Sequence, residues 1–288
     1  MNLTLNPKTK DEIDIFLGSP THALLLVGPL GSGKGALASF IATKVLDVSE
    51  NRLEVYPHFR RLITTGSSIS IEDVRNLHNF TSLRTPGKSD IRRVVILEKL
   101  ETMTLEAQNA FLKLLEEPPV DTMFVMTAND VNVLLPTVLS RTRKIIVLPP
   151  DKLELADFFN SQGHTDKEIE QVLNISGGLP GLATAILDSD KEHILVSQID
   201  VAKRLISSTK FERLLEISNL TKEKPQLPVL LMALRRVVRS ILVQAVKAHR
   251  TDEIVKWHKA LSEIVKTEAM LPNNPHPKLL LTNLFINL

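Results

Sequence analysis

Short apolar runs alternate with amphipathic segments through the first half of the chain. Four runs are too short for helices and are bounded by turn residues, so they predict buried strands: Ala23–Val27, Val94–Leu97, Met123–Met126 and Ile145–Leu148. Helical spacing is found at about Pro7–Leu17, after Lys34 and at about Leu105–Leu115. Buried strands separated by helices indicate an α/β fold, with a parallel sheet covered on both faces, that ends near Pro149-Pro150.

Strand signals disappear after Asp151. Helical patterns follow near residues 151–161, 166–175 and 179–188, and a glycine-rich turn at 177–181 separates the last two. A long helix after Pro228 carries one apolar stripe: Leu230, Leu234, Val237, Ile241 and Ala245. We therefore predict three domains, at 1–149, 150–188 and 189–288. Periodicity alone fits two uses of the stripe, a subunit contact or the core of its own domain.

Composition narrows the class of protein. The 288 residues are 43% hydrophobic and 24% charged with a formal net charge of +2, which is typical of a globular protein and too balanced for one that coats nucleic acid. The absence of cysteine excludes disulfides and thiolate zinc sites. No run reaches the ~18 apolar residues of a spanning helix, and the first eight residues do not resemble a signal peptide. We expect a cytoplasmic protein without a membrane partner.

The segment Gly28–Lys34 fits the phosphate-binding pattern GxxxxGK and lies between a predicted strand and a predicted helix. In such loops backbone N–H groups and the helix N-terminus surround phosphates while the lysine reaches the outer pair. ATP or ADP is thus the expected ligand, and its candidate binding residues are Gly28, Pro29, Gly31, Ser32, Gly33, Lys34 and Gly35. Because Gly35 stands where the pattern needs a Ser or Thr hydroxyl for Mg²⁺, metal binding should be weak or absent.

Three further stretches resemble one family. Residues 97–101 and 104–119, ending in LEEPP, are similar to a segment of bacterial clamp-loader subunits of DNA polymerase III. Leu135–Arg141 is similar to their TILSR run, and Ser68–Leu77 to the segment before their second nucleotide motif. The chain thus resembles the delta-prime kind of clamp-loader subunit, in the AAA+ class. The resemblance is strong over about 20–150, fair over 151–188 and compositional beyond.

The resemblance implies a damaged ATP site. Family members end the second strand with an Asp-Glu pair that supports Mg²⁺ and polarises water, whereas Glu98 and Lys99 stand here. An ammonium group has no lone pair to accept a proton, whereas Glu98 can still support a metal and is a further candidate residue of the nucleotide site. Leu182 replaces the arginine of the helix that begins in the glycine-rich turn, and the segment Val45–His58 is too short and cysteine-free for the family's zinc module, so no zinc is expected.

Other residues imply retained roles. Asn129 matches a position that contacts the γ-phosphate, and Arg141 matches the catalytic arginine presented in trans to a neighbour's ATP. The domains would then be an AAA+ domain, a helical lid and a collar. The implied function is a stator subunit that helps load the sliding clamp onto primed DNA, within a hetero-oligomer of clamp-loader subunits.

Two other functions stay open. One is an active AAA+ motor that uses Glu98 and a water in place of the missing hydroxyl. The other is a small-molecule P-loop kinase, which would need a lid with clustered arginines that we do not find. The basic residues of the last domain should form a solvated face rather than a DNA site: Arg235, Arg236, Arg239, Lys247, His249 and Arg250.

Overall fold

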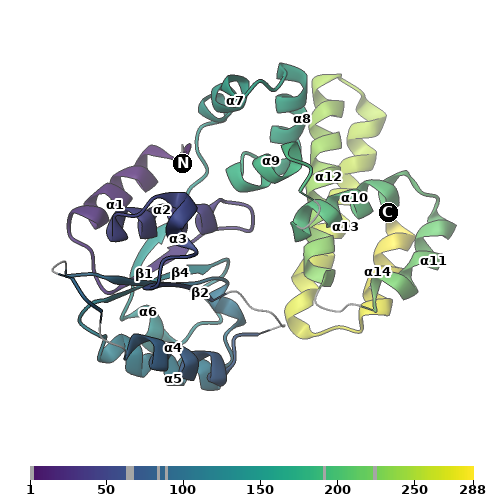
Figure 1. Cartoon of the computed structure of the whole chain (residues 1–288). Helices are drawn as coiled ribbons and strands as arrows, with labels where there is room; N and C mark the ends of the chain where they lie inside the picture. Colours follow the sequence, from purple (N-terminus) through teal and green to yellow (C-terminus); the bar gives the residue numbers. More distant parts are fainter. Residues whose placement is uncertain (1–2, 63–67, 83–84, 88–89, 191–192, 223–225) are drawn as a thin grey trace. The chain divides into compact units, whose positions relative to one another are not determined.

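The computed structural model describes residues 3–62, 68–82, 85–87, 90–190, 193–222 and 226–288. These form two compact units, Met1–Glu154 and Leu155–Leu288, each with its own core. The predicted domain boundaries at 149 and 188 stay predictions. The first unit is an α/β domain and the second is entirely helical over its described residues (Figure 1).

The first unit is built on a parallel sheet whose strand order, over the described residues, is β2-β3-β4-β1-β5. Its strands are β1 (Ala23–Val27), β2 (Phe59–Leu62), β3 (Arg93–Leu97), β4 (Thr122–Ala128) and β5 (Arg143–Ile146). Its helices are α1 (Pro7–Gly18), α2 (Lys34–Leu46), α3 (Glu50–Leu53), α4 (Ile71–Thr81), α5 (Leu105–Glu116) and α6 (Pro136–Leu139), with a 3-10 turn, η1 (Leu100–Thr102). The predicted α/β fold is confirmed.

Strand β2 and helix α4 were not predicted as elements. The four residues of β2 include Arg60 and Arg61, so they form no apolar run, and only Phe59 of this edge strand is buried. Helix α4 begins with a capping box in which Ser70 and Asp73 satisfy each other's backbone N–H groups.

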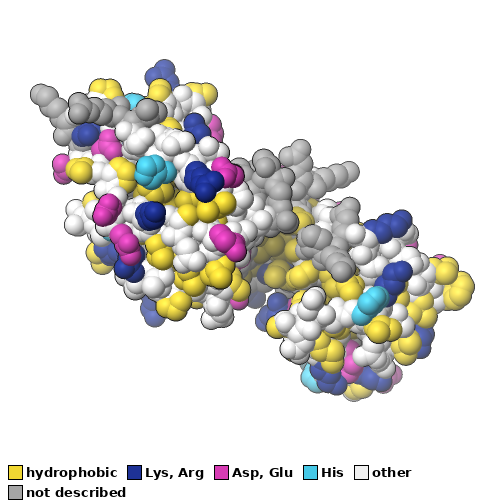
Figure 2. All heavy atoms as spheres, turned by 90° about the horizontal axis from the view of Figure 1, so that it is seen from below, with side chains coloured by type: hydrophobic (Ala, Val, Ile, Leu, Met, Phe, Trp, Pro, Cys, Tyr) yellow, Lys and Arg dark blue, Asp and Glu magenta, His cyan; other side chains and the backbone are white. Residues whose placement is uncertain are grey.

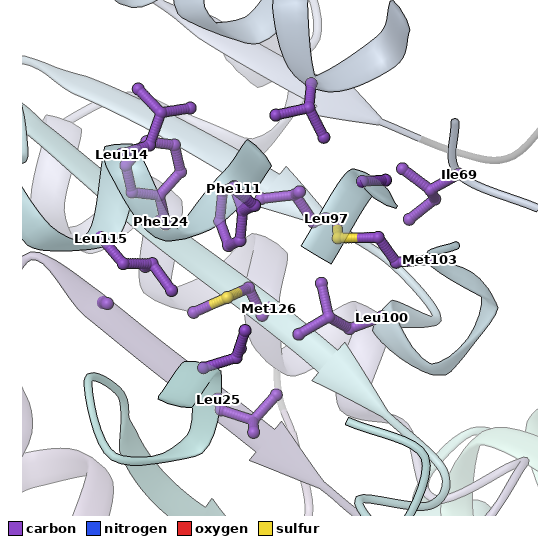
Figure 3. Packing of buried hydrophobic residues seen from close by; sticks show 14 of the residues in the cluster. Leu25, Ile69, Leu97, Leu100, Met103, Phe111, Leu114, Leu115, Phe124 and Met126 are labelled. Atoms are coloured by element: carbon purple, nitrogen blue, oxygen red, sulfur yellow. The ribbon is translucent and has the colours of Figure 1, made fainter. Parts of the chain in front are cut away.

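Side chains alternate between the two faces of the sheet. Helices α1, α2 and α3 cover one face, where Leu24 and Leu26 of β1 are buried. Helices α4, α5 and α6 cover the other, where Leu25 of β1 packs with Phe124 and Met126 of β4 (Figures 1 and 3). Both faces of the central strands are therefore dry, as their continuous apolar sequences indicated.

The second unit contains helices joined by short connections. They are α7 (Lys152–Ser161, which crosses the unit boundary), α8 (Asp166–Ser176), α9 (Pro180–Leu187), α10 (Ile194–Ser207), α11 (Lys210–Leu220), α12 (Leu227–Lys247), α13 (Thr251–Met270) and α14 (Pro277–Asn287), with a 3-10 turn, η3 (Leu271–Asn273). The stripe on α12 packs inside this unit: Leu230, Leu234, Val237 and Ala245 are buried and α12 lies against α10 and α13. Of its two possible uses, the stripe has the role of a domain core.

The surface carries both signs of charge. On the face drawn in Figure 2, basic and acidic side chains are interspersed over the first unit, which suits the small net charge. Within the described residues, no helix is both long enough and apolar enough to cross a membrane.

The packing of α5 on β4 should contribute strongly to the stability of the first unit. Phe111 is fully buried and meets Phe124 edge to face, with ring centroids 5.4 Å apart (Figure 3). Phe111→Ala should lower the free energy of unfolding by about 3–5 kcal/mol through lost burial and a cavity. Leu105→Ala on the same helix, at a largely exposed position, is the control and should change it by roughly 0.5 kcal/mol or less. Urea unfolding measures both, and equal losses would contradict this assignment of the core.

Candidate functional site

The carboxyl ends of three neighbouring strands bring the predicted site residues together. Gly28 follows β1, Glu98 follows β3 and Asn129 follows β4. The register pairs Val27 with Ala128, and the Gly28 N–H donates to the carbonyl of Ala128 at 3.1 Å. Residues that lie up to a hundred positions apart in the sequence thus share one edge of the sheet, which is where parallel α/β sheets hold ligands.

The glycine loop has the backbone of a phosphate cradle. Gly31 and Gly33 adopt φ values of 88° and 83°, which favour glycine, and Lys34 begins α2. A Cβ at Gly28 would lie 3.0 Å from the Ser32 Oγ, so this position has no room for a side chain. Among the described residues, the buried Ser32 Oγ finds no hydrogen-bond partner. These features fit the phosphates of a nucleotide, which would supply the missing acceptor.

Lys34 is held inside the loop. Its Nζ donates to the Asn129 Oδ1 at 2.6 Å and to the Pro29 carbonyl at 3.2 Å, and 7% of the residue is exposed. Burial lowers the pKa of Lys34 to about 8, Glu101 and Glu98 oppose this shift, and nearby Lys99 adds to it. The ammonium group is therefore partly desolvated and has no direct carboxylate partner among the described residues. A bound anion would balance its charge.

Asn129 is fixed by a residue that sequence reasoning missed. The Glu101 carboxylate accepts from the Asn129 side-chain amide and, at 3.2 Å, from its backbone N–H. With its amide group bound to Glu101, the Asn129 oxygen turns to Lys34. Glu101 lies within the stretch that carried the resemblance, yet an acid two residues beyond Lys99 gave no sign of this role.

The Glu98 carboxylate, which could otherwise face a metal ion, is bound by a cation of the chain itself. A Cβ at Gly35 would lie 3.6 Å from the Glu98 Oε1, so a hydroxyl at Gly35 would face this carboxylate. Instead Arg61 of β2 donates through Nη1 to the Glu98 Oε1 at 2.7 Å and through Nη2 to the Ser39 Oγ at 2.8 Å. A guanidinium bound to Glu98 repels a metal ion, so the residues do not fit Mg²⁺ as they fit phosphate.

Arg61 is itself firmly placed. Its guanidinium also contacts the Glu54 carboxylate at 2.7–2.9 Å, and its side chain is 14% exposed. The role of Arg61 could have been predicted only if β2 had been predicted as a strand. Its two arginines interrupt the apolar run that would have indicated one.

Lys99 directly follows β3, and Leu182 lies on α9. Lys99 is exposed, with φ 55°, at the end of β3, and its backbone N–H donates to the Thr127 Oγ1 at 3.1 Å. Leu182 is buried on α9 of the second unit, where it contributes apolar packing and no charge.

Arg141 lies apart from the glycine loop, in the turn between α6 and β5. Its Nη2 contacts the Glu116 Oε1 at 2.8 Å and its Nη1 donates to the Thr137 carbonyl at 3.0 Å. The side chain remains 35% exposed and that of Glu116 48%. Two of the stretches that carried the resemblance, LEEPP and the Ser-Arg run, are therefore joined by an ion pair at the surface of the first unit.

The fold and the glycine loop define a P-loop protein of the AAA+ class. Residues 14–151 match the family model described as "DNA polymerase III, delta subunit". The delta-prime subunits of DNA polymerase III from Pseudomonas aeruginosa and Haemophilus influenzae are 32% and 25% identical, over 55% and 58% of this chain and 53% and 55% of those proteins. The chain thus spans about half the length of these curated relatives. The resemblance to a delta-prime-like clamp-loader subunit is confirmed.

A solved structure reproduces the fold over nearly the whole chain. A DNA polymerase III gamma subunit-related protein from Thermotoga maritima matches 96% of this chain and 97% of its own, with a TM-score of 0.52 and 19% identity. Helices beyond the AAA+ unit, where the sequence resemblance was only compositional, are included in that match.

The depressed pKa of Lys34 predicts a pH-dependent stability. The unfolded lysine has a pKa of 10.5 and the folded one about 8, so between these values the unfolded state binds more protons and stability rises with pH. Relative to Lys34→Met, which cannot titrate, the protein should gain about 2–3 kcal/mol in free energy of unfolding from pH 7.5 to 10. Urea unfolding of both proteins across this range measures it. A constant difference would show that Lys34 is not desolvated.

Proposed function

We propose that the chain serves as the stator of a clamp loader in DNA replication: it holds a nucleotide with little or no hydrolysis and supplies Arg141 to the ATP site of a neighbouring subunit. The observation that carries this proposal is the ion pair between Arg61 and Glu98 beside Gly35. This ion pair supports a site that binds phosphate and does not bind Mg²⁺.

Three features support slow or absent hydrolysis. Gly35 offers no hydroxyl to a metal, Glu98 is bound by Arg61, and Lys99 cannot act as a base. ATP or ADP would then be held by the loop backbone, Ser32 and Lys34. Its phosphates would neutralise the charge in the loop without being hydrolysed. An active motor would need Glu98 to bind a metal, which the ion pair with Arg61 opposes.

The proposed partners follow from the relatives. We infer a hetero-oligomer with other clamp-loader subunits, which acts on a sliding clamp and touches primed DNA through the assembled complex, in the cytoplasm. The partly exposed guanidinium of Arg141 supports a trans role, because a fork of N–H donors at the surface can bind phosphate oxygens of another subunit.

Nucleotide binding should be nearly independent of Mg²⁺. Because Arg61 forms an ion pair with Glu98, the affinity of the purified chain for ATP should change by less than about threefold between excess Mg²⁺ and excess EDTA. Arg61→Gln leaves Glu98 without its cation and should create a Mg²⁺-dependent tightening. Arg60→Gln, at the exposed neighbouring position that stacks on Phe80, is the control and should behave as the unaltered chain. Titration calorimetry measures the affinities, and a tenfold or larger Mg²⁺ effect in the unaltered chain would contradict the proposal.

Arg141→Ala should slow hydrolysis in a neighbouring subunit. Catalytic arginines supplied in trans raise rates by about 10³–10⁵-fold, so a loss of roughly a hundredfold or more is expected at the adjoining site. Single-turnover ATP hydrolysis is measured in the assembled complex, with the loop lysines of all other ATP sites changed to alanine. Lys144→Ala removes an exposed cation nearby and should have little effect. Unchanged hydrolysis in a fully assembled Arg141→Ala complex would refute the trans role.

A further inference from the structure

A small basic pocket lies in the second unit and is lined by residues other than those of the candidate nucleotide site. It encloses about 310 Å³ between the end of α8, one face of α12 and α13. Arg235, Arg236 and Arg239 of α12 line it together with Asn174 of α8, and no carboxylate is among the lining residues. The expectation of a solvated basic face is therefore only partly met, because these arginines converge on a cavity.

Arg236 forms the inner wall of the pocket. Its Nη1 donates to the carbonyl of Ser176, the last residue of α8, at 2.7 Å. Its Nε is buried and has no hydrogen-bond partner among the described residues. A Cβ at Gly177 would lie 3.3 Å from the Nη1, and Gly177 has a φ of 65°, so a glycine keeps this approach open. The guanidinium is thus fixed while part of its donor capacity is unused.

The charge at this place is poorly balanced. Burial, followed by the neighbouring Arg235 and Arg239, lowers the pKa of Arg236 to about 10. Glu268 of α13 is the acid that acts on it, and the Arg235 Nε contacts that carboxylate at 3.2 Å. Arg239 is exposed and makes no hydrogen bond or ion pair with any described residue. Glu268 therefore acts on Arg235 and Arg236, while Arg239 has no acidic partner among the described residues.

We propose that Arg235, Arg236 and Arg239 form a binding site for a phosphate group, either of a free oligophosphate or of a nucleic-acid backbone. Convergent guanidinium forks match phosphate oxygens. A phosphate also brings more negative charge than a carboxylate, which suits three arginines of which only two interact with an acid. The Asn174 amide can donate to the same group. This site is independent of the proposed nucleotide site, because its residues come from α8 and α12.

Arg239→Gln is the informative variant, because Arg239 is exposed and its loss should leave the fold intact. Arg250→Gln, which removes an equal charge from an exposed position at the start of α13, is the matched control. Both substitutions are made in the whole chain together with Lys34→Ala, so that phosphate binding at the glycine loop does not contribute to the signal. Thermal unfolding, monitored by circular dichroism, verifies that each variant is folded. The probes are inorganic triphosphate, measured by calorimetry without Mg²⁺, and a fluorescein-labelled single-stranded oligodeoxynucleotide, measured by anisotropy.

Arg239→Gln should weaken binding of at least one probe about tenfold, as expected for the loss of a charge-assisted contact, and Arg250→Gln by less than about twofold. An effect on triphosphate alone identifies a site for free anions, and an effect on the oligonucleotide identifies the nucleic-acid backbone as the source. Equal losses in both variants would overturn the proposal. So would the absence of binding at millimolar probe, or a hexaglutamate peptide as the only ligand sensitive to Arg239.

Discussion

The parallel register of β1, β3 and β4 is the constraint on which the candidate nucleotide site depends. Val27 pairs with Ala128, so β1 and β4 end level with each other. Leu97 pairs with Met126, so β3 ends slightly earlier at the same edge of the sheet. The residues that follow them, among them Gly28, have no freedom to separate, because both faces of these strands are packed against helices. A site built on such buried strands keeps its geometry before any ligand arrives.

Within this edge the chain balances much of its own charge. Arg61 is shared between Glu98 and Glu54, and Glu101 holds Asn129, which in turn accepts from Lys34. In an ordinary hydrolytic site a metal ion would take the place beside the Glu98 carboxylate. Here the guanidinium of Arg61, which belongs to the chain itself, lies beside Glu98 instead. The remaining imbalance lies at Lys34, where an anion rather than a metal would relieve it.

Sequence patterns predicted the strands that contain apolar runs. A strand is present at each of the four predicted runs, although β5 comprises Arg143–Ile146 rather than Ile145–Leu148, and the glycine spacing located the loop and Lys34. Arg61 was missed because β2 is an edge strand with charged side chains, and strand periodicity is weak in four residues. The partnership of Glu101 with Asn129, and that of Glu116 with Arg141, depend on how the chain folds, and spacing along the sequence does not reveal them.

The ion pair between Arg141 and Glu116 explains how an arginine that acts in trans can be oriented in advance and still be free to bind a phosphate of another subunit. Both side chains are partly exposed, and exposed ion pairs contribute only about 0–1 kcal/mol. Glu116 can therefore restrict the guanidinium to one direction without holding it strongly. If Arg141 acts on a neighbouring subunit as proposed, a phosphate with greater negative charge would displace Glu116 at little cost. The same contact that orders the arginine in the single chain would then release it to a partner.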